Sequence, residues 1–294
     1  MTHKNDRGPG PDGSLSPDSS LRPELNAMPD LNRMQDPTPG PDRNPILDST
    51  PRLDRNRMQD PTPRPDSTPK QAVRWPAAPI PGRYIRPLRL FFVLFYTVGV
   101  AGLSLPFSRE LFQQLIPLAL LLSFGALIAF YPSLHRPKTL LFFLFVGMTG
   151  FLVEMAGVQT GKIFGIYTYG AGLGWKIHGT PLMIGVNWLM LTLFFADLIH
   201  RSGIRGGWAP PLAAAGMVAY DLVLEQAAPL IDMWSWQDAS VPLRNYLAWF
   251  LLALFFQILL KRFRIPARHP LSLTLLLCQF FFFLLLVLLF NGLK

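Results

Sequence analysis

The chain has 294 residues, of which 50% are hydrophobic and only 15% are charged, and its formal net charge is +9. Residues 1–82 hold 17 of the 29 prolines and are electrically balanced, with 11 acidic and 11 basic side chains, so the excess positive charge lies in residues 83–294. There the basic residues stand singly or in short clusters between long apolar runs. This distribution argues against nucleic-acid binding, which needs a continuous basic face, and favours a membrane protein.

The N-terminal segment contains a tandem repeat, because Asn-Arg-Met-Gln-Asp-Pro-Thr-Pro occurs at 32–39 and again at 56–63. The repeat has no apolar face to bury and its prolines remove backbone donors, so nothing offsets the entropy of ordering. We therefore predict that residues 1–82 are a disordered, proline-rich tail that acts as a flexible tether, with partner docking as the lesser alternative. No cleavable signal precedes the first apolar run, which is itself expected to direct membrane insertion.

Seven apolar segments follow, each about the twenty residues that a helix needs to cross a hydrocarbon core of roughly 30 Å. Backbone groups in lipid must be hydrogen-bonded within the protein, and these runs are too uniformly apolar for barrel strands. The predicted fold class is therefore all-α, a polytopic transmembrane helix bundle over residues 83–294. The expected spans are 88–105, 111–131, 138–158, 181–201, 208–230, 245–261 and 270–291.

The segments that connect these spans differ in charge. Eleven basic residues fall on the side of the first span's start, and five fall on the opposite side. By the positive-inside rule, we expect an integral protein of the cell (inner) membrane with its N-terminus in the cytoplasm and its C-terminus outside. The eleven are Arg83, Arg86, Arg89, Arg136, Lys138, Arg201, Arg205, Lys261, Arg262, Arg264 and Arg268.

Carboxyl groups inside the spans are the first candidates for chemistry, because charge within a bilayer is costly and usually functional. Glu154 lies near the outer end of the third span, and Asp221 and Glu225, one helical turn apart, share a face of the fifth. The alternative is that these acids only pair with neighbours and fix helix packing. Asp197, beside Arg201 at the cytoplasmic end of the fourth span, is interpreted as structural.

The loop expected after Glu154 holds six glycines before Trp175, a density that interrupts helices and lets the backbone approach a ligand closely. It is not a phosphate-binding loop, because Lys162 is not followed by Ser or Thr and no strand is expected before it. Tyr167 and Tyr169 are candidates for a site, although each taken alone also suits the aromatic belt of a membrane interface.

A second polar and aromatic group follows the fifth span, and the fourth span contains an amide beside an indole. Carboxylates together with His178 could hold a hard cation, but no His pair at ligand spacing exists, so no metal site is predicted. Glu110 and Asp238 are interpreted as ordinary solvated residues. The polar and aromatic residues are Asn187, Trp188, Asp232, Trp234, Trp236, Pro242, Asn245, Tyr246 and Trp249.

The motifs that combine in this pattern are Glu154 to Tyr169, Gly179-Thr-Pro-Leu to Asn187-Trp188, Asp221 to Glu225, Trp234-x-Trp236, and Pro242-x-x-Asn245-Tyr246-x-x-Trp249. Over residues 88–265 the chain resembles the CruF-type carotenoid hydratases, the family that includes bisanhydrobacterioruberin hydratase. The resemblance implies a carotenoid 1',2'-hydratase that needs no cofactor. Such an enzyme adds water to the terminal double bond of an acyclic end group, of the lycopene, gamma-carotene or bisanhydrobacterioruberin type, and takes its substrate from the bilayer.

The implied chemistry requires a carboxylic acid that protonates the alkene, and burial in an apolar bundle raises the pKa of a carboxyl group in the direction that such a donor needs. Aromatic faces would stabilise the tertiary carbocation. We expect Glu154 or Asp221 as the acid, and the other acid or Glu225 as the base that orients water. The expected substrate-binding residues are Tyr167, Tyr169, Asn187, Trp188, Asp232, Trp234, Trp236, Asn245 and Tyr246.

Three other functions fit parts of the pattern. A membrane lycopene cyclase would form the same carbocation and quench it with an internal alkene instead of water. A membrane prenyltransferase would need paired acidic clusters for magnesium diphosphate, and Asp221-x-x-x-Glu225 is only one cluster. The chain could also be a noncatalytic carotenoid-binding subunit, and other enzymes of carotenoid synthesis are conceivable partners in each case.

Overall fold

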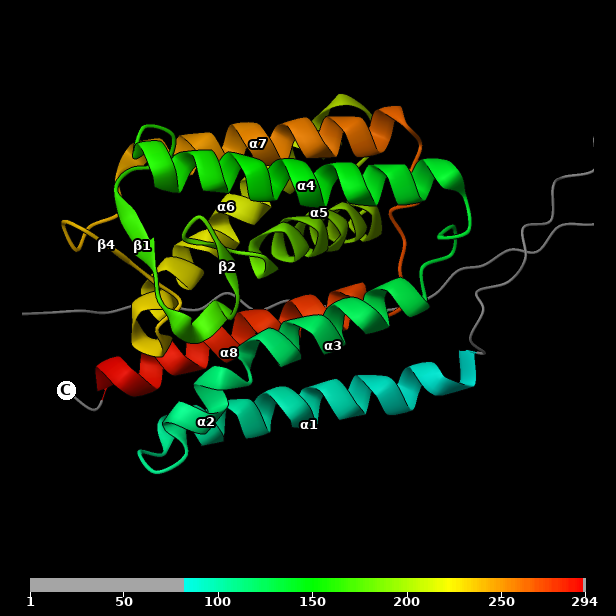
Figure 1. Ribbon diagram of the computed structural model, residues 1–294. Helices are drawn as coiled ribbons and strands as arrows, with labels where there is room; N and C mark the ends of the chain where they lie inside the picture. Colours follow the sequence, from blue (N-terminus) through cyan, green and yellow to red (C-terminus); the bar gives the residue numbers. More distant parts are fainter. Residues whose placement is uncertain (1–81, 293–294) are drawn as a thin grey trace, which may run out of the picture. The chain divides into compact units, whose positions relative to one another are not determined.

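The structure is a computed structural model that describes residues 82–292. The predicted tail with its tandem repeat, apart from Gly82, lies outside the described residues. Within them the chain is mostly helical, which confirms the all-α fold class (Figure 1). The α-helices are α1 (Ile85–Ser104), α2 (Arg109–Gln114), α3 (Ile116–Ala129), α4 (Pro137–Thr160), α5 (Met183–Arg201), α6 (Ala209–Ala227), α7 (Leu243–Arg262) and α8 (Ser272–Gly292).

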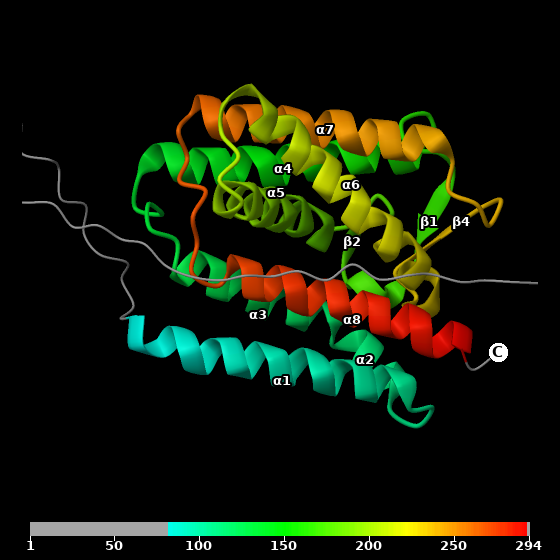
Figure 2. The ribbon, with the colours of Figure 1, turned by 180° about the vertical axis from the view of Figure 1, so that it is seen from behind.

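Five of these helices are long and apolar enough to cross a membrane, namely α1 with its preceding turn, α4, α5, α7 and α8. The apolar α3 has only 14 residues, and α6, which carries two acids, is not among the five. The helices run roughly along one direction in both views, and successive long segments alternate in sense (Figures 1 and 2). The chain is therefore a membrane protein.

The second expected span, 111–131, is not one helix. Helix α2 ends at Gln114, and α3 begins at Ile116 with Pro117 in its first turn. Proline lacks an N–H group and its fixed φ suits the first turn of a helix, so it starts α3 instead of continuing α2. The third span agrees more closely, because α4 ends at Thr160, two residues beyond the expected end at 158, and is followed by Gly161, whose φ of +62° is typical of a helix C-terminus.

The two ends of the bundle differ in structure. One end, which we call the ribbon end, carries two short antiparallel strand pairs, β1 (Tyr167–Tyr169) with β4 (Trp234–Trp236) and β2 (Lys176–Ile177) with β3 (Thr180–Pro181). The opposite end, the basic end, holds the start of α1 and the α3–α4, α5–α6 and α7–α8 connections (Figure 1). The eleven basic residues expected on one side all lie in or beside these segments.

Helix α5 forms the centre of the bundle, where it packs against α3, α4, α6 and α8. Its backbone approaches α4 closely at two glycines, because a Cβ atom on Gly185 would lie only 2.5 Å from the carbonyl oxygen of Gly147. Small residues allow such contacts between membrane helices. The α4–α5 seam is therefore tightly closed.

An ion pair with a buried carboxylate fixes the connection to α8 at the basic end. Asp197 is fully buried, and its Oδ2 lies 2.7 Å from Nε of Arg201. The same guanidinium donates to the carbonyl oxygen of His269 at 2.8 Å, and the backbone N–H of His269 donates to Asp197 Oδ1 at 3.3 Å. Burial lowers the pKa of His269 to about 4, so this ring is neutral at pH 7 and Arg201 is the cation that balances Asp197.

We predict that Asp197→Ala destabilises the protein. The replacement leaves Arg201 and the His269 N–H without their shared acceptor, and a buried group that loses its partner costs about 1–3 kcal/mol. Thermal unfolding in detergent should therefore shift to lower temperature. Glu110→Ala, which removes an exposed acid from α2, is the control, and equal unfolding temperatures for the two variants would contradict this role.

Candidate functional site

The β1–β4 ribbon presents four aromatic side chains on one face. Tyr167 pairs with Trp236 and Tyr169 pairs with Trp234, and the paired rings lie 4.9 Å and 6.0 Å apart. Because side chains alternate along a strand, residues two apart point the same way. The ribbon therefore turns two phenols and two indoles toward the helices below it.

The two phenols bind Glu154 of α4. Its Oε2 accepts hydrogen bonds from the hydroxyls of Tyr167 at 2.6 Å and Tyr169 at 3.0 Å, and its Oε1 accepts one from Trp188 Nε1 at 3.2 Å. Burial, together with the adjacent Glu154, raises the pKa of both tyrosines above the ordinary value. Both hydroxyls therefore keep their protons and remain available as donors.

The two indoles bind Glu225 of α6 in the same manner. Its Oε2 accepts hydrogen bonds from Trp234 Nε1 at 2.9 Å and Trp236 Nε1 at 2.7 Å, while Oε1 accepts one from Asn245 Nδ2 at 3.2 Å. Each strand of the ribbon thus directs two donors at one oxygen of one acid. The arrangement fixes both carboxyl groups relative to each other through the paired strands.

Asp221 lies one turn before Glu225 and is fully buried. Its Oδ2 is 3.4 Å from Asn245 Nδ2, whereas its Oδ1 has no hydrogen-bond partner among the described residues. None of Glu154, Asp221 and Glu225 forms an ion pair within residues 82–292. The acids are therefore accommodated by hydrogen bonds and not by cations.

Glu154 and Glu225 both line a cavity of about 20 Å³, which has room for about one water molecule. Trp249 of α7 closes one wall, with its ring 4.3 Å from that of Trp188. The remaining walls are Tyr167, Tyr169, Ile184, Asn187, Trp234, Trp236 and Asn245. The cavity is thus small, aromatic and open to two acids and two amides.

Three residues expected at the site do not line this cavity. Asp232 is exposed in a turn with φ +55°, where its carboxylate accepts a hydrogen bond from the Ala171 N–H at 2.8 Å and so holds two loops together. Tyr246 is half-buried on α7. Asp221 likewise lies behind the cavity wall and reaches it only through Asn245.

Two lining residues and the element that organises the site were not predicted. Ile184 and Trp249 line the cavity, although Trp249 was not among the expected substrate-binding residues. The alternation in Tyr-Thr-Tyr and Trp-Ser-Trp is the signal that could have indicated two strands with aromatic faces. Within residues 82–292, no group of three or more His, Cys, Asp or Glu side chains is placed to hold a metal ion.

Comparison with protein families identifies the family of this chain. Residues 115–293, more than half of the chain, match the model of a family described as "Carotenoid biosynthesis protein". The chain belongs to this family. Comparisons with curated proteins and with solved structures give no significant match. Every residue that lines the cavity of this carotenoid biosynthesis protein lies within the matched region, whereas α1 lies outside it.

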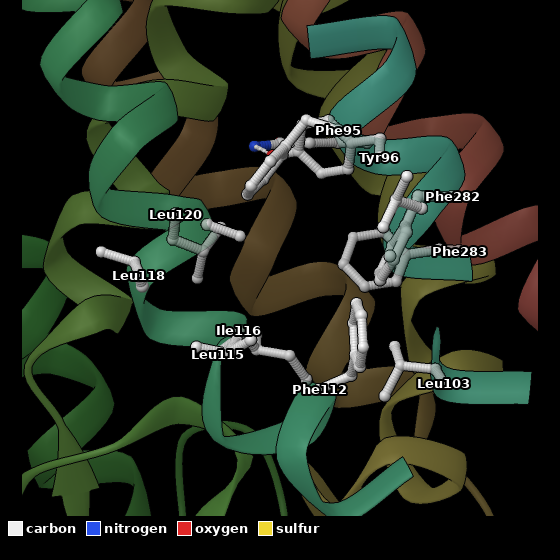
Figure 3. A pocket seen from close by; sticks show the side chains of 14 residues that line it. Phe95, Tyr96, Leu103, Phe112, Leu115, Ile116, Leu118, Leu120, Phe282 and Phe283 are labelled. Carbon is white, nitrogen blue, oxygen red and sulfur yellow. Dashed lines mark hydrogen bonds between the residues drawn. The ribbon is translucent and has the colours of Figure 1, made fainter. Parts of the chain in front are cut away.

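A second cavity, of about 120 Å³, lies between α1, α3 and α8 (Figure 3). Phe95, Phe112 and Phe282 line it, together with the polar residues Tyr96 and Gln279. Gln279 Nε2 donates to the Tyr96 hydroxyl at 3.0 Å, so these polar groups bind each other. No carboxyl group lines this larger space, and the acids of the carotenoid biosynthesis protein converge only on the smaller cavity.

We predict that Gly150→Ala disturbs the site. A Cβ atom on Gly150 would lie 2.7 Å from Cγ of Trp188, whose ring is backed by Trp249 and cannot retreat. Such overpacking typically costs about 1–3 kcal/mol, so the detergent-solubilised protein should unfold at lower temperature. In Gly125→Ala the new Cβ meets nothing within 4 Å, and this control should be as stable as the parent or more stable.

Proposed function

We propose that this protein is a carotenoid 1',2'-hydratase, a hydro-lyase that adds water to the terminal double bond of an acyclic carotenoid. The observation that carries the proposal is the pair of carboxyl groups, Glu154 and Glu225, on the wall of a water-sized aromatic cavity inside a membrane bundle. A carotenoid dissolves in the bilayer, so an enzyme that hydrates its end has to bring both acid and water into the bundle.

The partners of the two acids support different roles for them. Glu154 is bound by two tyrosine hydroxyls, which can both donate and accept a hydrogen bond, whereas Glu225 is bound by two indole N–H groups, which can only donate. Glu154 can therefore lose a proton and regain one through Tyr167 or Tyr169. Glu225 remains an acceptor. We assign Glu154 as the general acid and Glu225 as the base.

In the proposed reaction, Glu154 transfers its proton to the CH carbon of the terminal double bond, which leaves a tertiary carbocation on the neighbouring carbon. A water oxygen forms the new C–O bond with this carbon, and Glu225 takes a proton from that water. The net change is the addition of one water, without oxidation or reduction. Exchange with solvent then removes the proton from Glu225 and returns one to Glu154.

Other side chains of the cavity support these steps. The faces of Trp188 and Trp249 stabilise a cation without offering a nucleophile that would capture it. The amides of Asn187 and Asn245 hold the water beside Glu225. Asp221 acts through Asn245, which it shares with Glu225, and is a positioning residue.

Cavity size favours hydration over cyclisation. A lycopene cyclase must fold the end of the polyene back so that an internal alkene reaches the cation, whereas hydration needs space for one water beside the reacting carbon. A cavity of about 20 Å³ suits the second requirement. The mass of the product separates the two reactions, because hydration adds a water and cyclisation leaves the mass unchanged.

We predict that co-expression in a lycopene-accumulating host gives a monohydroxylated carotenoid. In membranes that contain the protein and preformed lycopene, D₂O should place one deuterium on carbon, and H₂¹⁸O should supply the hydroxyl oxygen. Glu154→Gln and Glu225→Gln should each lower product formation by about 10²–10⁴-fold, the usual contribution of a general acid or base. Asp221→Asn should lower product formation about tenfold, as expected for the loss of one hydrogen bond to a charged group.

Glu110→Gln on α2 is the matched control and should leave the product unchanged. A product of unaltered mass would identify a cyclase, and loss of activity on chelation would favour a prenyltransferase. Pigments that stay the same with and without the protein would indicate a noncatalytic binding subunit. Full hydration by Glu154→Gln and Glu225→Gln would refute the assigned acid and base.

We also propose that the basic end faces the cytoplasm of the cell (inner) membrane, so that the site lies near the outer surface. The eleven basic residues of that end support this orientation. Alkaline phosphatase fused after Lys294 should then be active in bacterial cells, whereas green fluorescent protein fused there should be dark. The reverse pattern would show the opposite orientation.

A further inference from the structure

An apolar groove of about 640 Å³ runs between α4 and α7. The two helices lie side by side in both views (Figures 1 and 2), yet they contact each other at few points. Leu141, Leu144 and Met148 on α4 are each more than half exposed along it. The groove therefore opens toward the lipid and not toward the interior of the bundle.

The groove leads toward the candidate site. Met148 on α4 and Phe255 on α7 line the end of the groove that is nearer the ribbon. Glu154 is six residues beyond Met148, and Trp249 is six residues from Phe255 in the same direction. At a rise of 1.5 Å per residue, both side chains are about 9 Å beyond the groove. Because α4 and α7 are antiparallel, the acid and the indole lie at the same depth.

Aromatic rings connect the groove to the cavity without a break. Phe145 faces Phe255 across the groove at 6.1 Å, and Phe256 follows at 5.8 Å from Phe255. Phe256 lies 5.8 Å from Trp188, whose ring lies 4.3 Å from that of Trp249 in the cavity wall. The groove and the cavity are therefore joined by one continuous cluster of aromatic rings, in which Phe256 and Trp188 are fully buried.

The far end of the groove is closed at the basic end, where Lys138 Nζ donates to the carbonyl oxygen of Phe263 at 3.5 Å. From Lys138 to Glu154 the distance along α4 is about 24 Å, somewhat less than a hydrocarbon core of roughly 30 Å. The groove and site together thus span most of the apolar layer.

We propose that this groove binds the polyene chain of the substrate, parallel to α4 and α7, so that only its terminal double bond reaches Glu154 and Glu225. The inference rests on the proposed function and adds the route and binding surface of its substrate. A conjugated polyene is straight and stiff, so it loses little conformational entropy in a straight groove, whereas a flexible acyl chain loses more. The 20 Å³ cavity has no room for the chain itself, and the α4–α5 seam is closed by Gly147 and Gly185.

The test measures the carotenoid bound to a variant that is expected not to hydrate it, so that the result reports binding and not turnover. Glu154→Gln protein is purified from the lycopene-accumulating host, and its visible absorption gives the carotenoid retained per chain. Adding Leu144→Trp or Met148→Trp fills the groove and should lower this ratio about tenfold, which corresponds to about 1.4 kcal/mol. Leu90→Trp, at a lipid-facing position of α1 that is 60% exposed, is the matched control and should retain the pigment.

In the active protein, the same groove variants should lose hydration of the carotenoid by a similar factor, and Leu90→Trp should not. If both groove variants retained as much pigment and hydrated as much carotenoid as their parents, the proposal would be overturned. The groove would then be a binding surface for membrane lipid. Failure of the proposed function has a different signature, because the parent protein would then give no hydroxylated product while the retained pigment still depended on Leu144 and Met148.

Discussion

The structure depends on one constraint, which is that carboxyl groups placed at membrane depth need hydrogen-bond donors. Backbone N–H groups within a helix are already used by the helix itself, so α4 and α6 cannot supply them. Trp188 of α5 and Asn245 of α7 each give one side-chain donor, and the other donors come from two connections that leave the membrane helices and return over their ends. Tyr167 and Tyr169 from one connection bind Glu154, and Trp234 and Trp236 from the other bind Glu225.

This constraint explains why the two connections pair as strands. A strand places residues two apart on the same face, so one three-residue strand directs two donors at a single carboxyl oxygen. Pairing β1 with β4 then sets the separation of the two acids. The loops around the ribbon pack closely against each other. A Cβ atom on Gly170 would lie 2.1 Å from Oδ1 of Asp232, whose carboxylate accepts a hydrogen bond from the N–H of Ala171.

The helices could be predicted from the sequence because their signal is local. Apolar runs of membrane length placed every long helix to within a few residues, and only Pro117 divided a segment expected to be continuous. The acids were also identified, since a carboxyl group in such a run is conspicuous. The ribbon was missed because three-residue strands give almost no periodic signal and their partners are far apart in the chain. For the same reason, the sequence could not distinguish Glu225, which lines the cavity, from Asp221, which lies behind it.

The different shapes of the cavity and the groove fit the two reactants of a hydration. In the proposed reaction, water must approach the cation as a single small molecule, and the ribbon end offers a space of that size bordered by two amides and Glu225. The polyene must arrive from the lipid as a straight chain, and the loosely packed α4–α7 seam offers a straight apolar surface open on that side. In the proposed substrate, flexible methylene groups join the terminal double bond to the stiff conjugated chain, and a space for one water gives them no room to fold an internal alkene back onto the cation. Capture by water is then the outcome that the geometry favours.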